Sequence, residues 1–161
     1  LGAKQLFVGR GAVWFVGQGV DLTVRQIEGK YPNWRAVWPK ELPTWVAVDG
    51  RLLDVLHRAL VIANLAEKDG ADIVGLALQD GEVTVSAKGQ GETFTETVGL
   101  DGFGEATVYF NGRYLIEVLK LIGEGQLALS PDASAAVITA IGVPEYRHLL
   151  LPVIVRGGDV A

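Results

Sequence analysis

Two segments of the chain repeat one pattern at a constant separation of 62 residues. The segment VDGRLLDVLHRAL begins at Val48, and the segment FNGRYLIEVLKLI begins at Phe110. Each contains a Gly-Arg pair and apolar residues at helical spacing, and each is followed by a strand-like stretch with the letters LAL. Such a repeat indicates one supersecondary unit that occurs twice and buries its apolar face against its copy. We therefore predict an α+β fold over residues 44–155, a duplicated strand, helix and three-strand unit with two helices packed on antiparallel sheets.

The first copy predicts an amphipathic helix that begins after Asp49, a residue type favoured at the N-cap. Its apolar residues recur with a period of about 3.6 and form one stripe. The stripe comprises Leu52, Leu53, Leu56, Ala59, Leu60 and Ala63. Near the end of the helix, Val61, Ile62 and Leu65 point away from this stripe. Apolar residues off the stripe indicate a further contact, for which another subunit is one candidate.

The opposite faces of the two predicted helices carry basic residues, although the net charge of the chain is −5. Arg51, Asp54 and Arg58 stand on the first helix, and Arg113, Glu117 and Lys120 stand on the second. These faces are either ordinary solvated surfaces or surfaces directed at one polyanion. An acidic chain is a poor candidate for holding nucleic acid by a broad basic surface, since phosphate neutralisation supplies most of that affinity. Any role on DNA must work in another way.

The connection EGKYPNWRAVWPK, residues 28–40, cannot be a regular helix or strand, because Pro32 and Pro39 fix φ and remove backbone donors. Connections usually lie on the surface, yet this one is rich in aromatic and apolar residues. It is therefore either a plug under a neighbouring sheet or one wall of a binding groove. Before it, residues 4–27 alternate apolar and polar positions around Gly-rich turns, which predicts an antiparallel meander.

The residue patterns of common enzymes are missing from the sequence. Neither GxGxxG nor GxxxxGK[ST] occurs, and the absence of Cys excludes thiolate nucleophiles and Cys-ligated zinc. His57 and His148 lack the spacing of metal ligands. We therefore predict a non-catalytic protein with no metal and no cofactor.

Localisation follows from two further absences in the sequence. No apolar run approaches the roughly 20 residues that span a bilayer, and the N-terminus lacks the pattern of a signal peptide. We expect a cytoplasmic protein with no membrane partner. Because the chain starts at Leu1 and contains no Met, we also expect it to be a piece of a larger protein.

Three motifs together resemble the third domain of the bacterial DNA polymerase III β subunit, the replicative sliding clamp. They are IEGKYPNWRAVWPK, FNGRYLIEVLKLI and the terminal HLLLPVIV, and they occur in the family's order at compatible spacing. The resemblance covers about residues 20–155 and implies the DNA clamp fold. It also implies a domain layout: residues 1–30 as the last strands of the preceding clamp domain, 31–43 as the connection, 44–156 as the third clamp domain and 157–161 as a tail. The chain departs from the family pattern at Glu28, where Asp is preferred, and at Ala36, where a basic residue is frequent.

The resemblance implies a processivity factor rather than an enzyme. In that family two subunits close into a ring, and duplex DNA is held by enclosure, independently of its sequence. The implied partners are duplex DNA, linear motifs of the polymerase, the clamp loader and repair proteins, and a second subunit in a homodimer. Residue by residue, the implied bore-facing cations are Arg51, Arg58, Arg113 and Lys120, and the implied subunit interface contains Val61 and Ile62.

The resemblance also implies an apolar cleft that receives the linear motifs. Its implied members are Pro32, Val37, Tyr114, Leu149, Leu151 and Pro152. Tyr31 and Trp34 are expected to anchor the connection to the domain. Two other hypotheses stay open: a free-standing truncated clamp-like protein that binds motifs without encircling DNA, and a small ligand-binding or enzymatic domain. A pocket with clustered ionisable residues would favour the last of these.

Overall fold

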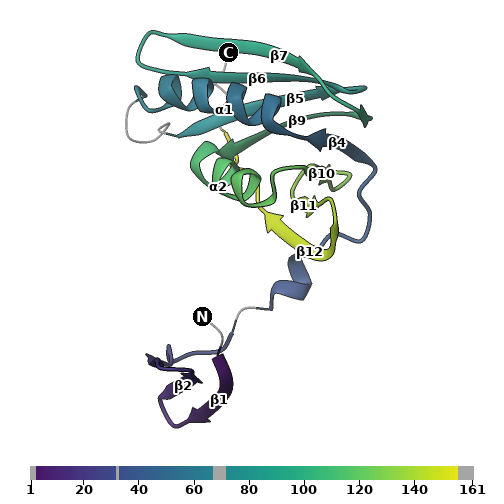
Figure 1. Ribbon diagram of the computed structural model, residues 1–161. Helices are drawn as coiled ribbons and strands as arrows, with labels where there is room; N and C mark the ends of the chain where they lie inside the picture. The colour runs from purple at the N-terminus through teal and green to yellow at the C-terminus, as the bar shows by residue number, and fades with distance from the viewer. Residues whose placement is uncertain (1–2, 32, 67–71, 156–161) are drawn as a thin grey trace. The chain divides into compact units, whose positions relative to one another are not determined.

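The computed structural model describes residues 3–31, 33–66 and 72–155. The chain forms two compact units, Leu1–Ala36 and Val37–Ala161, and each is described by itself (Figure 1). The smaller unit is a three-stranded antiparallel sheet in which β2 is central, as the alternating pattern predicts. Its strands are β1 (Ala3–Gly9), β2 (Ala12–Gly17) and β3 (Asp21–Arg25).

Among its described residues, the connection contains one short 3-10 turn, η1 (Trp34–Val37), and no regular helix or strand, as its prolines predict. The guanidinium of Arg35 lies 4.3 Å from the centre of the Trp34 ring, within the range of a cation–π contact. Tyr31 is exposed. The expectation that it anchors the connection to the domain concerns a contact between the two units, and it stays a prediction. Pro32 lies outside the described residues.

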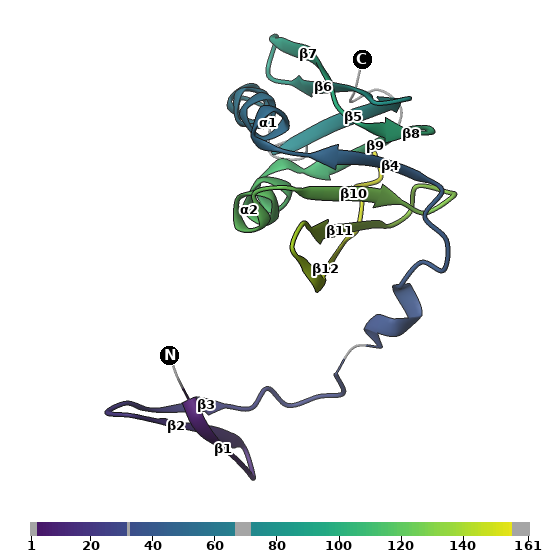
Figure 2. The ribbon, with the colours of Figure 1, turned by 45° about the vertical axis from the view of Figure 1, so that its right-hand side comes forward.

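The larger unit contains the strand, helix and three-strand order twice, which confirms the fold predicted from the repeat. Figure 2 shows α1 and α2 side by side on one side of the sheets. The first copy comprises β4 (Thr44–Val48), α1 (Gly50–Ala63), β5 (Ile73–Gln79), β6 (Glu82–Lys88) and β7 (Thr93–Gly99). After the two-residue strand β8 (Gly102–Phe103), the second comprises β9 (Glu105–Asn111), α2 (Gly112–Ile122), β10 (Gly125–Leu129), β11 (Ala136–Ala140) and β12 (Val143–Leu150).

The two copies exchange their leading strands. One sheet has the order β7-β6-β5-β9, so the strand that precedes α2 extends the sheet of the first copy. The other sheet has the order β12-β11-β10-β4-β8, so the strand that precedes α1 extends the sheet of the second copy. All pairings are antiparallel. Each sheet is therefore completed only by a strand from the other copy.

The helices start at equivalent positions but bury different rows of side chains. Asp49 and Asn111 are N-caps 62 residues apart, and each side chain accepts hydrogen bonds from the backbone N–H groups of the second and third residues that follow it. The buried rows repeat instead at 63 residues: Leu52, Val55 and Leu56 correspond to Leu115, Val118 and Leu119. Relative to its cap, α2 thus buries a row displaced by one residue, or about 100° around the axis.

This displacement corrects the residue pairs expected from the sequence. Leu53 and Leu60, which the sequence pairs with Leu115 and Ile122, are only half-buried, although they pack against the core. Val55, outside the predicted stripe, is buried. At a separation of 62, the buried Leu52 corresponds to Tyr114, which is exposed. The displacement therefore leaves an aromatic ring at the surface in the first turn of α2.

The closing strand is shorter than the sequence predicts. The pattern YRHLLLPVIV favours a strand through residue 155, but β12 ends at Leu150. Pro152 has no N–H and cannot donate to the ladder, so pairing with β11 stops there. The chain then reaches the other sheet, where the N–H of Val153 donates to the carbonyl of Tyr109 on β9 at 2.7 Å.

Candidate partner-binding cleft and helix face

An apolar row crosses the outer face of the five-stranded sheet. The register aligns Trp45 on β4, Ala128 on β10, Val137 on β11 and Leu149 on β12. Ala128 and Val137 are buried, but they do not belong to the main core, which lies on the other face. Leu149 is half-buried at the end of the row. The outer face of this sheet thus carries a second apolar surface that ends at a predicted cleft residue.

The cleft implied by the resemblance does not include Ala128 and Val137. A pattern in the sequence nevertheless indicated that this face of the sheet is buried. The strand AVITA has apolar residues on both faces, whereas a strand with one solvated face alternates with polar residues. Consecutive apolar residues such as Ala136, Val137 and Ile138 in one strand indicate burial on two sides. Trp45 carried the same signal in the strand TWVAV.

The end of β12 and the segment after it contain three of the predicted cleft positions, and the last two lie near the start of α2. Leu151 is 54% exposed, and Pro152 and Leu149 are half-buried. The hydrogen bond from Val153 to Tyr109 holds this segment beside β9, which runs directly into the N-cap of α2. Tyr114, 61% exposed, lies in the first turn of that helix.

The other two predicted cleft positions are not placed with these. Val37 is exposed, but it lies on a separate segment, at the end of the 3-10 turn. Pro32 is outside the described residues. The described part of the chain therefore places Leu151 and Pro152 near the start of α2, with Leu149 just before them on β12.

The helix face contains the four predicted cations, all of which are exposed. Three of them are held by carboxylates of the same chain. Arg51 contacts Asp49 through Nε at 2.8 Å and through NH2 at 2.7 Å, and its NH1 donates to the carbonyl of Gly99. Burial raises the pKa of Asp49, but hydrogen bonds from Arg51 and Leu52 outweigh this effect and lower it overall. Arg51 therefore ties the capped start of α1 to the end of β7.

Arg113 forms the corresponding contact at the start of α2, with different partners. Its Nε donates to Asp72 at 2.7 Å, and its NH2 donates to the side chain of Asn64 at 2.9 Å. Asn64 is the C-cap of α1, and Asp72 precedes β5. The carboxylate of Asp72 is mostly buried, with a side-chain exposure of 19%. Arg113 thus joins the end of one helix to the start of the other.

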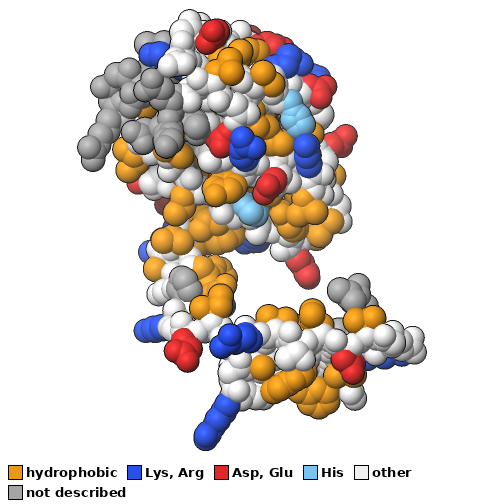
Figure 3. All heavy atoms as spheres, turned by 90° about the vertical axis from the view of Figure 1, so that its left-hand side faces the viewer, with side chains coloured by type: hydrophobic (Ala, Val, Ile, Leu, Met, Phe, Trp, Pro, Cys, Tyr) orange, Lys and Arg blue, Asp and Glu red, His pale blue; other side chains and the backbone are white. Residues whose placement is uncertain are grey.

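Arg58 pairs with a single carboxylate across the surface of the larger unit. Its Nε and NH2 contact the two oxygens of Glu96 on β7 at 3.0 and 2.5 Å. For Lys120 no such pairing is seen among the described residues. Positive and negative side chains are accordingly interspersed on the face of the larger unit in Figure 3. The helix face offers guanidinium groups that are already neutralised.

The predicted interface residues on α1 differ in exposure. Val61 is exposed, whereas Ile62 is half-buried and packs against the core. Leu65, just beyond the helix, is exposed and lies near Gly89, after β6. The apolar surface at this end of α1 is therefore formed by Val61 and Leu65 more than by Ile62.

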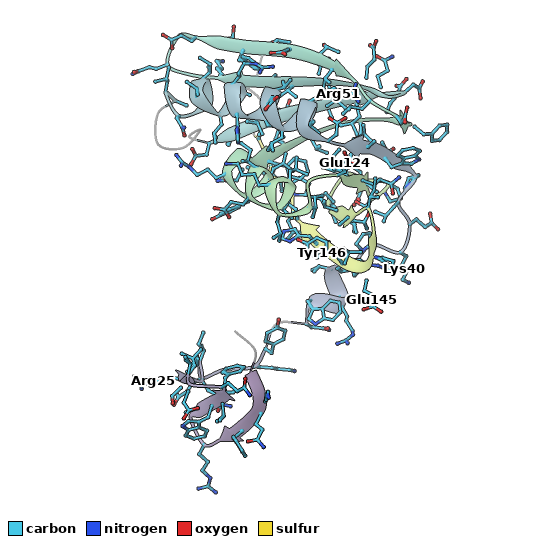
Figure 4. All side chains as sticks on the ribbon, viewed as in Figure 1. Arg25, Lys40, Arg51, Glu124, Glu145 and Tyr146 are labelled. Atoms are coloured by element: carbon cyan, nitrogen blue, oxygen red, sulfur yellow. The ribbon has the colours of Figure 1, made fainter. Side chains whose placement is uncertain are left out.

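An open hollow of about 570 Å³ lies beside the start of α1. Its ionisable lining consists of Asp49, Arg51, Asp80, Glu82, Asp101 and Glu124. Figure 4 shows Arg51 on α1 and Glu124 ahead of β10. Within the described residues, no group of carboxylates and histidines is arranged to hold a metal ion. Because Asp49 is a helix cap with a lowered pKa, it is unsuited to act as a proton donor.

Neither helix in the described part of the chain is long and apolar enough to cross a membrane.

Comparison with known proteins shows which proteins the chain resembles. No protein-family model matches the chain. The β sliding clamp of Synechococcus elongatus is 31% identical over 140 residues, which is 84% of this chain and 37% of that protein. The β sliding clamp of Halalkalibacterium halodurans is 31% identical over 136 residues, 80% of this chain and 35% of that protein. The DNA polymerase III β subunit of Pseudomonas aeruginosa superposes with a TM-score of 0.81, at 21% identity, over 92% of this chain and 41% of that chain.

The chain has the sliding-clamp fold. The sequence resemblance to the β sliding clamp and the predicted fold are both confirmed. The chain spans between one third and two fifths of the length of the curated β sliding clamps that it matches. The similarity therefore concerns a part of a clamp, and what a whole clamp does is a separate question.

Proposed function

We propose that the chain is part of a ring-shaped DNA sliding clamp, a non-catalytic processivity factor that encircles duplex DNA. One observation carries the proposal: a chain with 31% identity to β sliding clamps places its two helices side by side, with their polar faces exposed. In this assignment residues 44–156 are the third clamp domain, and residues 1–30 are the last strands of the domain before it. The ring is completed by the remaining domains and by a second subunit, which meets the surface of Val61 and Leu65.

DNA is held by enclosure rather than by tight contact. Strong electrostatic binding requires free cations that neutralise phosphates and release counterions. Three of the four cations on the helix face are instead paired with Asp49, Asp72 and Glu96. Weak phosphate contacts permit the ring to slide, which suits a processivity factor.

The cleft beside α2 is the proposed site for linear motifs of the polymerase and the clamp loader. Leu149, Leu151 and Pro152 supply an apolar wall, and Tyr114 supplies an aromatic edge with a hydroxyl group. Exposed apolar side chains gathered near a helix start mark partner sites more often than scattered ones do. The occupant is a short peptide with a Gln and an apolar end of the Leu-Phe type. Val37, exposed at the end of η1, is a further proposed member of the cleft.

Fluorescence anisotropy with a labelled peptide of this kind tests the cleft. The full chain should bind it, and Leu151→Asp should weaken binding by at least tenfold, because a charge replaces an apolar contact. Leu121→Asp is the matched control, since Leu121 is also an exposed leucine and lies near the other end of α2. Equal binding by the wild-type chain and both folded variants would refute the cleft.

A free-standing clamp-like protein that binds motifs without encircling DNA is the second candidate. The neutralised helix face favours it, because a protein that never meets DNA needs no free cations there. The mass of the native protein in a cell extract separates the two candidates. A subunit mass about three times that of this chain supports the ring, since this chain spans 37% of the Synechococcus elongatus clamp. A dimer of such subunits supports it as well.

A further inference from the structure

The three paired arginines of the helix face differ in what would have to break before they could bind anything else. Arg51 bonds to a carboxylate that also caps α1 and to the carbonyl of Gly99. Arg113 bonds to Asp72 and to Asn64, and so fastens the two helices together. Both arginines therefore belong to tertiary links with two partners each. Release of either one would loosen a helix end.

Arg58 has a simpler bond. In the described structure its guanidinium donates only to Glu96, through two parallel contacts to one carboxylate. A phosphate offers the same paired oxygens to a guanidinium fork. Both partners are accessible, with side-chain exposures of 51% for Arg58 and 39% for Glu96. One phosphate can therefore replace the carboxylate without disturbing a helix end.

The position of Glu96 on its strand is unusual for a charged residue. In β7, Phe94, Glu96 and Val98 lie on the row that faces the helix, and both apolar neighbours pack against the core. Glu96 pairs with Val85 of β6, which is fully buried. An inward-facing charge on an edge strand discourages pairing with another strand, and Arg58 on α1 supplies a partner for Glu96. The pair is thus held in place by the packing of α1 on β7.

We infer that Glu96 is an internal counter-ion that occupies the phosphate-binding position of Arg58, so that a DNA phosphate must displace it. Arg58 and Lys120 are then the exchangeable phosphate contacts of the helix face, while Arg51 and Arg113 are structural links. This inference rests on the proposed contact of the helix face with DNA. It attributes the weakness of the DNA contact to Glu96, because each phosphate that binds Arg58 must first break the ion pair between Arg58 and Glu96.

Binding of a labelled 30-base-pair duplex at several salt concentrations tests the inference on the full chain. Glu96→Gln should tighten binding about two- to fivefold at low salt, the range expected for an exposed ion pair. Glu105→Gln makes the same change in net charge at an exposed residue on β9 and should have a smaller effect, because salt screens distant charges. In the double variant Arg58→Ala/Glu96→Gln the gain should disappear. Equal gains for Glu96→Gln and Glu105→Gln, or a gain that survives loss of Arg58, would overturn the inference.

A second measurement separates this inference from the proposed function. Sodium tripolyphosphate is titrated into the isotopically labelled chain, and the Nε–Hε signal of Arg58 is followed by NMR. The signal should move in the wild-type chain, and it should move at a lower concentration in Glu96→Gln. If no variant binds duplex DNA but the signal behaves in this way, the proposed DNA contact fails while the counter-ion role stands. An Arg58 signal that responds identically in both proteins would refute the counter-ion role.

Discussion

The backbone N–H of Val153 donates a 2.7 Å hydrogen bond to the carbonyl of Tyr109, and this bond joins the chain after β12 to the opposite sheet. Tyr109 lies two residues before the N-cap of α2. The bond therefore fixes Leu151 and Pro152 relative to the first turn of the helix that carries Tyr114. A surface formed from two distant segments depends on such a link, because neither segment positions the other through side chains alone.

Replacement of Val153 by Pro removes the donor of this bond. The variant should lose about 1 kcal/mol of stability, the usual contribution of one hydrogen bond, and bind the motif peptide less tightly than the wild-type chain. Urea unfolding and peptide anisotropy measure the two effects. Val153→Ala keeps the N–H and should retain most of the peptide affinity. If Val153→Pro binds the peptide as well as Val153→Ala does, the bond does not organise the cleft.

Gly125 at the start of β10 admits no side chain. A Cβ built there would collide with the carbonyl oxygen of Thr139 on β11, the neighbouring strand. Gly125→Ala should therefore destabilise the larger unit by about 2 kcal/mol or more, as overpacking of a buried site does. Gly99→Ala is the control, because a Cβ at Gly99 meets no atom within 4 Å. Denaturant midpoints of the two variants should differ clearly; similar midpoints would show that β10 and β11 can shift apart at little cost.

Asp132 stabilises the turn between β10 and β11 in a pH-dependent way. Hydrogen bonds from the side chains of Ser134 and Ser130 and from the backbone of Ser134 lower the pKa of Asp132 to about 2. Because the pKa is lower in the folded state, the contribution is fully present above the ordinary value of 3.8 and is lost as pH falls toward about 2.

Comparison of Asp132→Asn with the wild-type chain checks this dependence. The variant should have a lower unfolding midpoint at pH 7, and the difference should shrink between pH 4 and pH 2. Asp54→Asn, on the exposed face of α1, changes the charge equally outside the turn and should not reproduce this narrowing. A difference that stays constant down to pH 2 would mean that the ionised carboxylate contributes nothing specific.

Linear duplex DNA should be scarcely retained by this chain near physiological ionic strength. One domain cannot enclose a duplex, and the few cations of the helix face are mostly neutralised. Binding at low salt should therefore be weak and should fall steeply as salt is added. A gel-shift titration measures this. Tight, salt-resistant retention would contradict the proposal and would indicate a dedicated DNA-binding surface elsewhere on the chain.

The sequence predicted most of the fold because its signals are local. The Asp49 cap and the apolar spacing that follows it predict α1 to within two residues at its end, and the Gly-Arg repeat locates α2. The sequence also contained a signal for the end of β12, because Pro152 cannot donate to a strand ladder. The apolar run LLLPVIV, however, favoured a longer strand. When two local signals conflict in this way, contacts with distant residues decide the structure. Here the deciding contact is the hydrogen bond from Val153 to Tyr109.

Features of the candidate site that depend on tertiary contacts could not be predicted. Arg58 and Glu96 are 38 residues apart, and no pattern in the chain pairs them. The basic residues of the helix face were correctly placed on the surface, but the neutralisation of Arg58 follows only from how α1 lies across β7, and that of Arg113 from its contact with Asp72. The one-residue displacement of the buried row in α2, which leaves Tyr114 exposed, likewise reflects the different surroundings of two similar helices.

The exchange of leading strands between the two copies has a consequence for how this unit can be divided. Cutting the chain between β8 and β9 would leave each half with an open sheet edge and without the strand that completes it. Neither half should fold alone, and the larger unit should melt in a single cooperative step despite its internal repetition. A lone ancestral copy would have needed a second molecule to donate the missing strand. The present unit thus has the strand connectivity that a strand-swapped dimer would have if its two copies were joined into one chain.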